Sequence, residues 1–567
     1  MLTLFRKIFT PRKPAIPPPP PPEPLLEGPV TRLMTSERSR WDQARSAATT
    51  GPHVLLATST GGHPSVTQLE CLLAMALTLR GARVSFLLCD AALPACEECM
   101  LKVFDSVEQF VANGPSFRCP PCFENGRKLY DLLGLKIFTY STFLDDANRE
   151  MAAHINRTTS LEEIPTYVRD GLKIGEHAMA GALRFFARGT LEGEPCSEAV
   201  VRRYFEASLL TADVMTKLFG TQGIHCACFH HGIYVPHGIT GETARKLNVP
   251  LVNWSTAYRK QRFIFSHGDT YHHTLLVEPA EDWQQFAFAA RHREQAEKYL
   301  KSRWSGSRDW IYFHEKPTED SQKICREIGM DLAKPTILLL TNVIWDAQLH
   351  YPANAFPNMI VWLVETIRYF AKRPELNLVI RVHPAEIRGG LPSRQLAADE
   401  IRKHFPELPR NVYVVGPDQD LSTYALAELC NAAIIYGTKT GVELTSMGIP
   451  VIVAGEAWIK NKGLTKDPAS PGEYFAALDQ LPLPGRLDEE VRNRALKYAY
   501  HFFFRRMIPI KGIEVLEGWP PFRANIQTLE DLSASRNPGL ETICNGILHG
   551  TPFVHPAENF DEEDLSA

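Results

Sequence analysis

The stretch 378–468 constrains the fold more than any other part of this chain. Three short apolar runs, at 378–382, 411–415 and 432–436, alternate with helical patterns, and a fourth run at 450–454 closes the series. Short apolar runs separated by helices are typical of strands in a parallel α/β sheet. Ligands of such sheets bind beyond the carboxyl ends of the strands. The polar residues that follow these runs are therefore expected to meet in one crevice.

The residues predicted for that crevice suit a nucleotide phosphate. Cations, hydroxyls and a new helix N-terminus, which offers backbone N–H groups, all favour a bound anion. The loop 437–441 reads GTKTG and joins a strand pattern to a helix pattern, although it is not a Walker A motif. Glu443 follows in the first helical turn, where it either accepts hydrogen bonds from ribose or complements the helix dipole. The predicted binding residues are Arg381, His383, Pro384, Gly437, Thr438, Lys439, Thr440, Gly441 and Glu443.

Four residues are candidates for the chemical step. His383 is expected to donate a hydrogen bond to a leaving phosphate oxygen, unless it only caps a strand end. Asp346 follows the first strand of the second domain and is either a base or an Asx-turn residue. His231 and His63 lie in loops after strands of the first domain and are predicted bases on the acceptor side. The loop 230–238 contains His230, His231 and His237, and the alternative to a base is that two of these imidazoles bind a metal. No nearby acidic ligand completes a standard metal motif, so no catalytic metal is expected.

Two cysteine pairs predict a structural zinc site. Cys96 and Cys99 form one C-x2-C pair, and Cys119 and Cys122 form a second one after 19 intervening residues. This spacing is typical of zinc sites, and four thiolates suit a closed tetrahedral centre. The alternative is a set of buried or redox-active thiols.

The predicted fold is α/β, with two Rossmann-like lobes, a cleft between them, and further helices at the C-terminus. The unit that starts near residue 52, a strand followed by a Gly-containing turn, a helix and a strand, begins the first lobe. The predicted segments are a disordered tail with a proline-rich spacer (1–50), the N-terminal lobe (51–280) with the cysteine insertion (96–122), a helical linker (281–334), the C-terminal lobe (335–470), and C-terminal helices with an acidic tail (471–567).

Composition limits the possible partners. The 61 Lys and Arg against 65 Asp and Glu leave a net charge of −4, which argues against nucleic acid. No run of about 18 apolar residues predicts a membrane span, and no secretory signal is recognisable. We therefore expect a cytoplasmic protein. Residues 1–13 mix apolar and basic side chains, which predicts either a peripheral contact with the inner face of the plasma membrane or a disordered tail.

Several of these motifs resemble a known family. The run VHP, the run YGTKTGVELTSMGIPVIVAG and the run KGLT look like bacterial capsule polysaccharide biosynthesis proteins, which are GT-B glycosyltransferases that include Kdo (3-deoxy-octulosonic acid) transferases. The resemblance is best over 335–470. It implies a nucleotide-sugar donor in the C-terminal lobe and a glycan or lipid-linked glycan acceptor in the N-terminal lobe.

The resemblance also implies roles for individual residues. His383-Pro384 matches the His-Pro pair that lies at the cytidine monophosphate of several sialyl- and Kdo-transferases. Thr438 to Gly441 match the phosphate loop of the family, and Glu443 falls where related sequences carry an acidic residue. An acidic-acidic-glycine catalytic triplet is not recognisable in this sequence, so the general base of the family cannot be transferred.

The expected function is transfer of a sugar from a nucleotide-sugar, for example a CMP-sugar, to a glycan in capsule or other cell-surface polysaccharide synthesis. Two alternatives stay open with the same fold. One is a phosphotransferase that uses a CDP-polyol donor, and the other is a non-catalytic scaffold or export component.

Overall fold

The computed structural model describes residues 28–560, apart from 305, 307, 311, 314–316, 332 and 348–353. The predicted membrane contact at 1–13, the polyproline spacer and the acidic end of the chain lie outside these residues. Of the helices within them, none has the length and apolar character needed to cross a membrane.

The first sheet has seven strands in the order β12-β6-β5-β4-β1-β2-β3. The strands from β5 to β3 in that order are parallel, whereas β6 and β12 are antiparallel to their neighbours. The strands are β1 (His53–Ser59), β2 (Arg83–Leu88), β3 (Lys136–Thr139), β4 (Cys226–His230), β5 (Leu251–Thr256), β6 (Arg262–His267) and β12 (Ile508–Pro509).

Helices cover both faces of this sheet. Successive residues of a strand point to opposite faces, and accordingly Leu55 and Leu56 of β1 belong to two different apolar cores. The helices of this half are α4 (Pro64–Leu79), α5 (Val107–Asn113), α6 (Cys119–Asp131), α7 (Asp146–Thr158), α8 (Ile174–Phe186), α9 (Ser197–Thr221), α10 (His237–Lys246) and α11 (Tyr271–Thr274).

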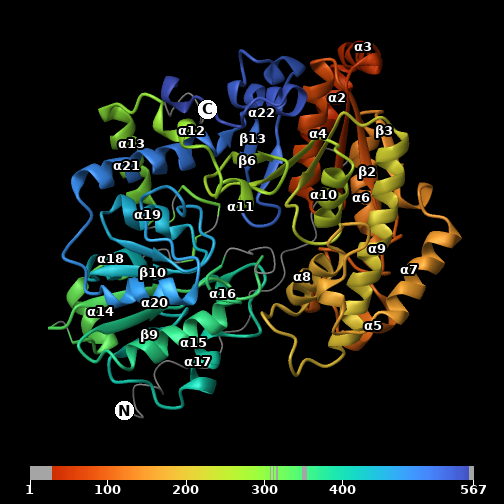
Figure 1. Ribbon diagram of the computed structural model, residues 1–567. Coiled ribbons are helices and arrows are strands. Elements are labelled where there is room, and N and C mark those ends of the chain that lie inside the picture. The colour runs from red at the N-terminus through yellow and green to blue at the C-terminus, as the bar shows by residue number, and fades with distance from the viewer. Residues whose placement is uncertain are drawn as a thin grey trace.

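The second sheet is fully parallel, in the order β11-β10-β7-β8-β9. Its strands are β7 (Thr336–Leu340), β8 (Asn377–Arg381), β9 (Val412–Val415), β10 (Ala432–Ile435) and β11 (Val451–Val453). Its helices and those that flank it are α12 (Ala280–Gln284), α13 (Ala290–Ser302), α14 (Ser321–Ile328), α15 (Met359–Phe370), α16 (Ala385–Arg388), α17 (Ala397–His404), α18 (Thr423–Glu428), α19 (Thr440–Ser446), α20 (Pro471–Asp479) and α21 (Glu489–Tyr500). The predicted α/β fold with two open sheets is confirmed (Figure 1).

The prediction of a disordered tail over 1–50 is wrong for its second half. Residues 29–36 form α2 (Pro29–Ser36), and α3 (Arg38–Ala47) follows at once. Trp41 of α3 is fully buried, and its indole Nε1 donates a hydrogen bond of 2.8 Å to the Leu133 carbonyl. Burial of a Trp side chain with its N–H satisfied stabilises the helix in a way that propensity alone does not show.

The C-terminal segment contains strands as well as the predicted helices. Strand β12 pairs with β6 of the first sheet, and β13 (Ile513–Val515) pairs with β14 (Phe522–Ala524). The last helix, α22 (Pro538–His549), packs in the same apolar core as α4. In Figure 1, this blue C-terminal part accordingly lies beside the red N-terminal helices. The chain therefore returns to the first half after it has completed the second sheet.

Candidate active site

A cavity of about 390 Å³ lies where the strands of the second sheet end and faces residues of the first half. Seven of the nine predicted binding residues line it, as the position beyond the carboxyl ends of parallel strands requires. The two exceptions are Gly441 and Glu443. The predicted residues that line the cavity are Arg381, His383, Pro384, Gly437, Thr438, Lys439 and Thr440.

His383 lines the cavity as a neutral ring with a defined tautomer. The backbone N–H of Ala385 donates a hydrogen bond of 3.1 Å to His383 Nδ1, so Nδ1 is an acceptor and Nε2 carries the proton. Burial, together with the charges of Lys439 and Arg381, lowers the pKa of His383 to about 4. The ring is therefore neutral near pH 7, and its one N–H group is a hydrogen-bond donor at Nε2.

Glu443 is the centre of a buried ion network and does not line the cavity. Its Oε1 atom lies 2.9 Å from Arg303 Nε and 3.1 Å from Lys439 Nζ, and its Oε2 atom accepts from the Tyr424 hydroxyl. Burial alone would raise the pKa of Glu443, but the charges of Arg303 and Lys439 hold it below its usual value. Both carboxylate oxygens already have donors in the free protein. A hydrogen bond from ribose to Glu443 stays a prediction.

Two other predicted binding residues support the structure of the cavity. Arg381 is buried, and its terminal nitrogens donate to the carbonyls of Gly416, Gln419 and Leu421, which fixes the loop after β9. At Gly441, an added Cβ would lie 2.6 Å from a side-chain atom of Ile435. Gly441 therefore allows α19 to pack closely on the strand before it. The structure thus assigns Arg381 and Gly441 to support of the cavity.

An aromatic pair missed by the sequence analysis forms one wall of the cavity. The rings of Trp304 and Tyr424 are stacked, with centroids 5.6 Å apart and an interplanar angle of 5°. Both residues line the cavity, together with Arg303 and Tyr258. Trp304 and Arg303 follow α13, in the segment predicted to be only a linker. The sequence around them has no hydrophobic periodicity that distinguishes a residue lining a cavity from a residue at the surface.

The three candidate bases are Asp346, His231 and His63. Of these, only Asp346 lines the cavity. The Tyr234 hydroxyl donates a hydrogen bond of 2.9 Å to Asp346 Oδ1, which joins the two halves at this point. The ring of His231 stacks on that of Tyr234, with centroids 5.0 Å apart. His63 lies against Trp519, with ring centroids 4.5 Å apart. His231 and His63 are therefore not among the residues that line the cavity.

The four cysteines of the predicted zinc site are neighbours. Burial and the charge of Cys96 raise the pKa of Cys119 to about 12, and the same two causes raise that of Cys122. A hydrogen bond with Cys99, together with burial, raises the pKa of Cys96 well above its usual value. In the described part of the chain, however, no three of these sulfur atoms lie within 4.8 Å of one another. The structural zinc site stays a prediction.

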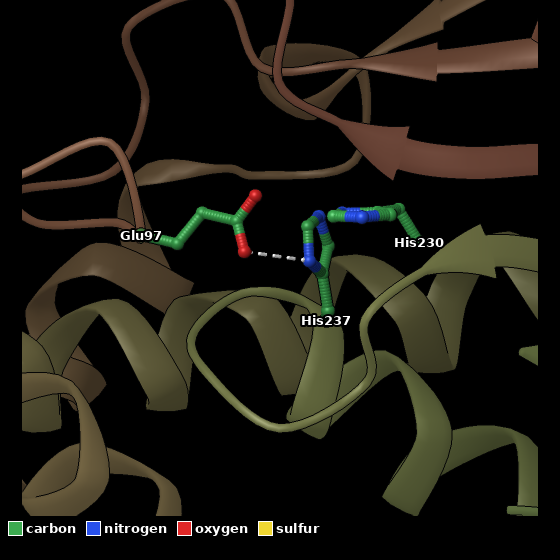
Figure 2. Close-up of side chains that lie close together, drawn as sticks. All are labelled: Glu97, His230 and His237. Atoms are coloured by element: carbon green, nitrogen blue, oxygen red, sulfur yellow. Dashed lines mark ion pairs between the residues drawn. The ribbon is translucent and has the colours of Figure 1, made fainter. Parts of the chain in front are cut away.

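A different cluster lies at the carboxyl ends of the first sheet, where Glu97, His230 and His237 face one another (Figure 2). Glu97 Oε2 lies 2.9 Å from His237 Nδ1. Sequence reasoning noted the histidines but missed the carboxylate, because Glu97 is more than 130 residues away along the chain, between two cysteines.

The sequence of the second half of the molecule matches a known protein family. Residues 282–477 match the profile of the family described as capsule polysaccharide biosynthesis protein. This segment is therefore similar in sequence to the capsule polysaccharide biosynthesis family. The predicted resemblance over 335–470 is thereby confirmed and extended towards the N-terminus. The capsule-synthesis segment contains His383, Lys439 and the Trp304–Tyr424 wall, so most of the cavity is formed by it.

Several solved structures are similar to this chain at low sequence identity. The beta Kdo 2,4 transferase of Thermosulfurimonas dismutans KpsC shares 16% identity over 49% of this chain and 80% of that one, with a TM-score of 0.32. The beta Kdo 2,7 transferase of the same KpsC shares 12% over 56% and 88%, with a TM-score of 0.29. A UDP-GlcNAc 2-epimerase from Neisseria meningitidis shares 12% over 79% and 95%, with a TM-score of 0.21. No curated protein sequence matches significantly.

Proposed function

We propose that this chain is a glycosyltransferase of capsule or other cell-surface polysaccharide synthesis. It takes a sugar from a nucleotide-sugar donor, for which a CMP-sugar is our first candidate, and transfers it to a glycan or lipid-linked glycan. The observation that carries the proposal is His383, a neutral ring with its N–H fixed at Nε2, in a cavity formed mainly by the capsule-synthesis segment.

The cavity offers each part of a nucleotide a suitable partner. The stacked pair of Trp304 and Tyr424 provides an aromatic surface of the kind on which a base stacks. The Thr438 and Thr440 hydroxyls, 3.1 Å apart, and the Lys439 ammonium provide donors for phosphate oxygens. Without a nucleotide-sugar bound, the Lys439 ammonium is paired with the Glu443 carboxylate. The free protein therefore does not carry an unpaired buried cation at this position.

The proposed step breaks the bond between the anomeric carbon and the phosphate oxygen of the donor, while the acceptor oxygen forms a bond to that carbon. Negative charge develops on the leaving phosphate, where the N–H of His383 and the ammonium of Lys439 stabilise it. Asp346 is the base that we favour for the acceptor proton, because it lines the cavity at the contact with the first half.

The location of the protein is part of the same proposal. A glycan or lipid-linked acceptor and a nucleotide-sugar donor would be met at the cytoplasmic face of the membrane, through the peripheral contact expected for residues 1–13.

The product distinguishes this function from its two alternatives. The purified protein is incubated with a CMP-sugar or a CDP-polyol and a capsule oligosaccharide, and the oligosaccharide is analysed by mass spectrometry. We expect a mass increase of one sugar residue without phosphorus. An increase that contains phosphorus would identify the polyol phosphotransferase instead. An unchanged oligosaccharide with every sugar donor would favour the scaffold.

A further inference from the structure

The cluster of Glu97, His230 and His237 lies at the carboxyl ends of neighbouring strands of the first sheet. In the first sheet β4, β1 and β2 are adjacent, and their carboxyl ends lie at one edge. His230 is the last residue of β4, His237 begins α10, and Glu97 lies in the loop after β2. One ligand-type atom from each residue lies within 4.8 Å of the other two, as Figure 2 illustrates. Regular elements therefore hold two of the three side chains.

The backbone fixes which nitrogen of His237 faces the cluster. His237 Nε2 is hydrogen-bonded to the Thr58 carbonyl, which can only accept, so Nε2 carries a proton. Nδ1 is then directed at Glu97. An imidazole whose other nitrogen donates to a backbone carbonyl is the usual arrangement of a metal-binding histidine, because the carbonyl fixes the tautomer and orients the ring.

The loop that carries Glu97 is held in place independently of the cluster. The backbone N–H of Glu97 donates a hydrogen bond of 2.8 Å to the Val235 carbonyl. The Arg184 guanidinium donates a hydrogen bond to the Glu97 carbonyl. The His237 side chain is fully buried, and only 12% of the Glu97 side chain is exposed. The carboxylate is therefore presented to the two imidazoles by a fixed backbone rather than by a solvent-exposed turn.

A proton shared between Glu97 and His237 gives a hydrogen-bond partner to only two of the three side chains. A proton between His237 Nδ1 and Glu97 Oε2 accounts for their 2.9 Å contact. It does not reach His230, whose Nδ1 is buried with no hydrogen-bond partner among the described residues. A buried polar atom without a partner destabilises the folded state. A cation that binds all three residues would give each of them a partner.

We propose that Glu97, His230 and His237 bind a divalent transition-metal ion of the zinc class. Two neutral imidazoles and one carboxylate are a ligand set that leaves one tetrahedral position open for water or a ligand oxygen. The 2.9 Å contact would widen to about 3.3 Å, the separation of two ligand atoms placed 2.0–2.1 Å from a tetrahedral zinc. This site differs from the four-cysteine site, and it does not depend on the proposed glycosyl transfer.

Cobalt is the probe that separates the two sites. The full-length protein is freed of metal with a chelator and titrated with Co²⁺ while its absorption spectrum is recorded. We expect one Co²⁺ per chain that shows visible d–d absorption without the near-ultraviolet charge-transfer band of a thiolate ligand. Zn²⁺ should displace this cobalt, because it lies above Co²⁺ in affinity for such ligands.

Variants assign that cobalt to the cluster. Glu97→Gln and His230→Ala should each weaken Co²⁺ binding by more than the roughly 10–100-fold that follows loss of an outer-shell partner. Glu98→Gln is the matched control, because Glu98 is the adjacent carboxylate but is not one of the three converging residues. It should bind Co²⁺ as the unmodified protein does. Circular dichroism of the metal-free variants checks that each is folded, and Glu97→Gln decides alone if His230→Ala is not.

Two results would overturn the proposal. The first is no d–d absorption at any Co²⁺ concentration, or absorption that Glu97→Gln and His230→Ala leave unchanged, which would show that a shared proton alone holds Glu97 and His237. The second is cobalt bound only with a thiolate charge-transfer band that disappears in Cys96→Ser, which would assign all metal to the cysteines.

Discussion

Replacing His383 by alanine is expected to lower the turnover number of sugar transfer by about 10²–10³-fold, the usual cost of one donor at a developing oxyanion. The reason is that the His383 Nε2–H group is fixed by the Ala385 N–H on the opposite ring nitrogen, so it donates without reorientation. Initial rates at saturating donor and acceptor measure the effect, with circular dichroism as the check on folding.

His404→Ala is the matched control for this prediction. His404 is an exposed histidine at the end of α17 in the same half of the molecule, so its loss should leave the rate unchanged. A turnover number in His383→Ala within a factor of two or so of the unmodified protein would remove His383 from the mechanism. Because the ring is neutral at pH 7, the loss in His383→Ala should be similar at pH 7 and pH 8.

The second large effect is on stability. Glu443→Gln should lower the free energy of unfolding by about 3–5 kcal/mol, because it leaves the buried charges of Arg303 and Lys439 without their shared carboxylate. Urea unfolding followed by circular dichroism measures it. Glu407→Gln, at an exposed carboxylate of the same half, should change stability by no more than about 0.5 kcal/mol.

The pH dependence of stability provides a second readout of the same network. The pKa of Glu443 is lowered in the folded protein, so its contribution is present above its unfolded value of 4.5 and is lost as the pH falls below that value. Stability of Glu443→Gln should therefore fall less steeply between pH 5 and the acid limit than that of the unmodified protein. A Glu443→Gln variant as stable as the unmodified protein at pH 7 would show that the network contributes nothing.

The second sheet and its loop were predictable because their signals are local. Apolar runs such as 432–436 specify strands, and the GTKTG loop follows directly from one of them. Seven of nine predicted residues line the cavity for that reason. The pattern could not show that Arg381 would turn its guanidinium to three backbone carbonyls, because those acceptors lie in a loop more than 30 residues later.

The residues that were missed depend on contacts distant in sequence. Arg303 meets Glu443 across 140 positions, and Glu97 meets His237 across a similar distance. Strand β12 returns to β6 after more than 200 residues. Trp41 is buried in a core that includes Leu133, whose carbonyl accepts from its indole N–H more than 90 residues away. Periodicity describes which face of an element is apolar, but it does not say which distant element covers that face.

Thermal unfolding of the purified protein with CMP, CDP, UDP, GDP or ADP tests the central claim, that the cavity beside His383 binds the nucleotide of a sugar donor. A ligand that binds only the folded state adds about 2.7 kcal/mol at a hundred times its Kd. We expect selective stabilisation by CMP that is lost in Trp304→Ala, where the stacking wall is removed. Absence of stabilisation by all five nucleotides, at concentrations up to several millimolar, would contradict the account.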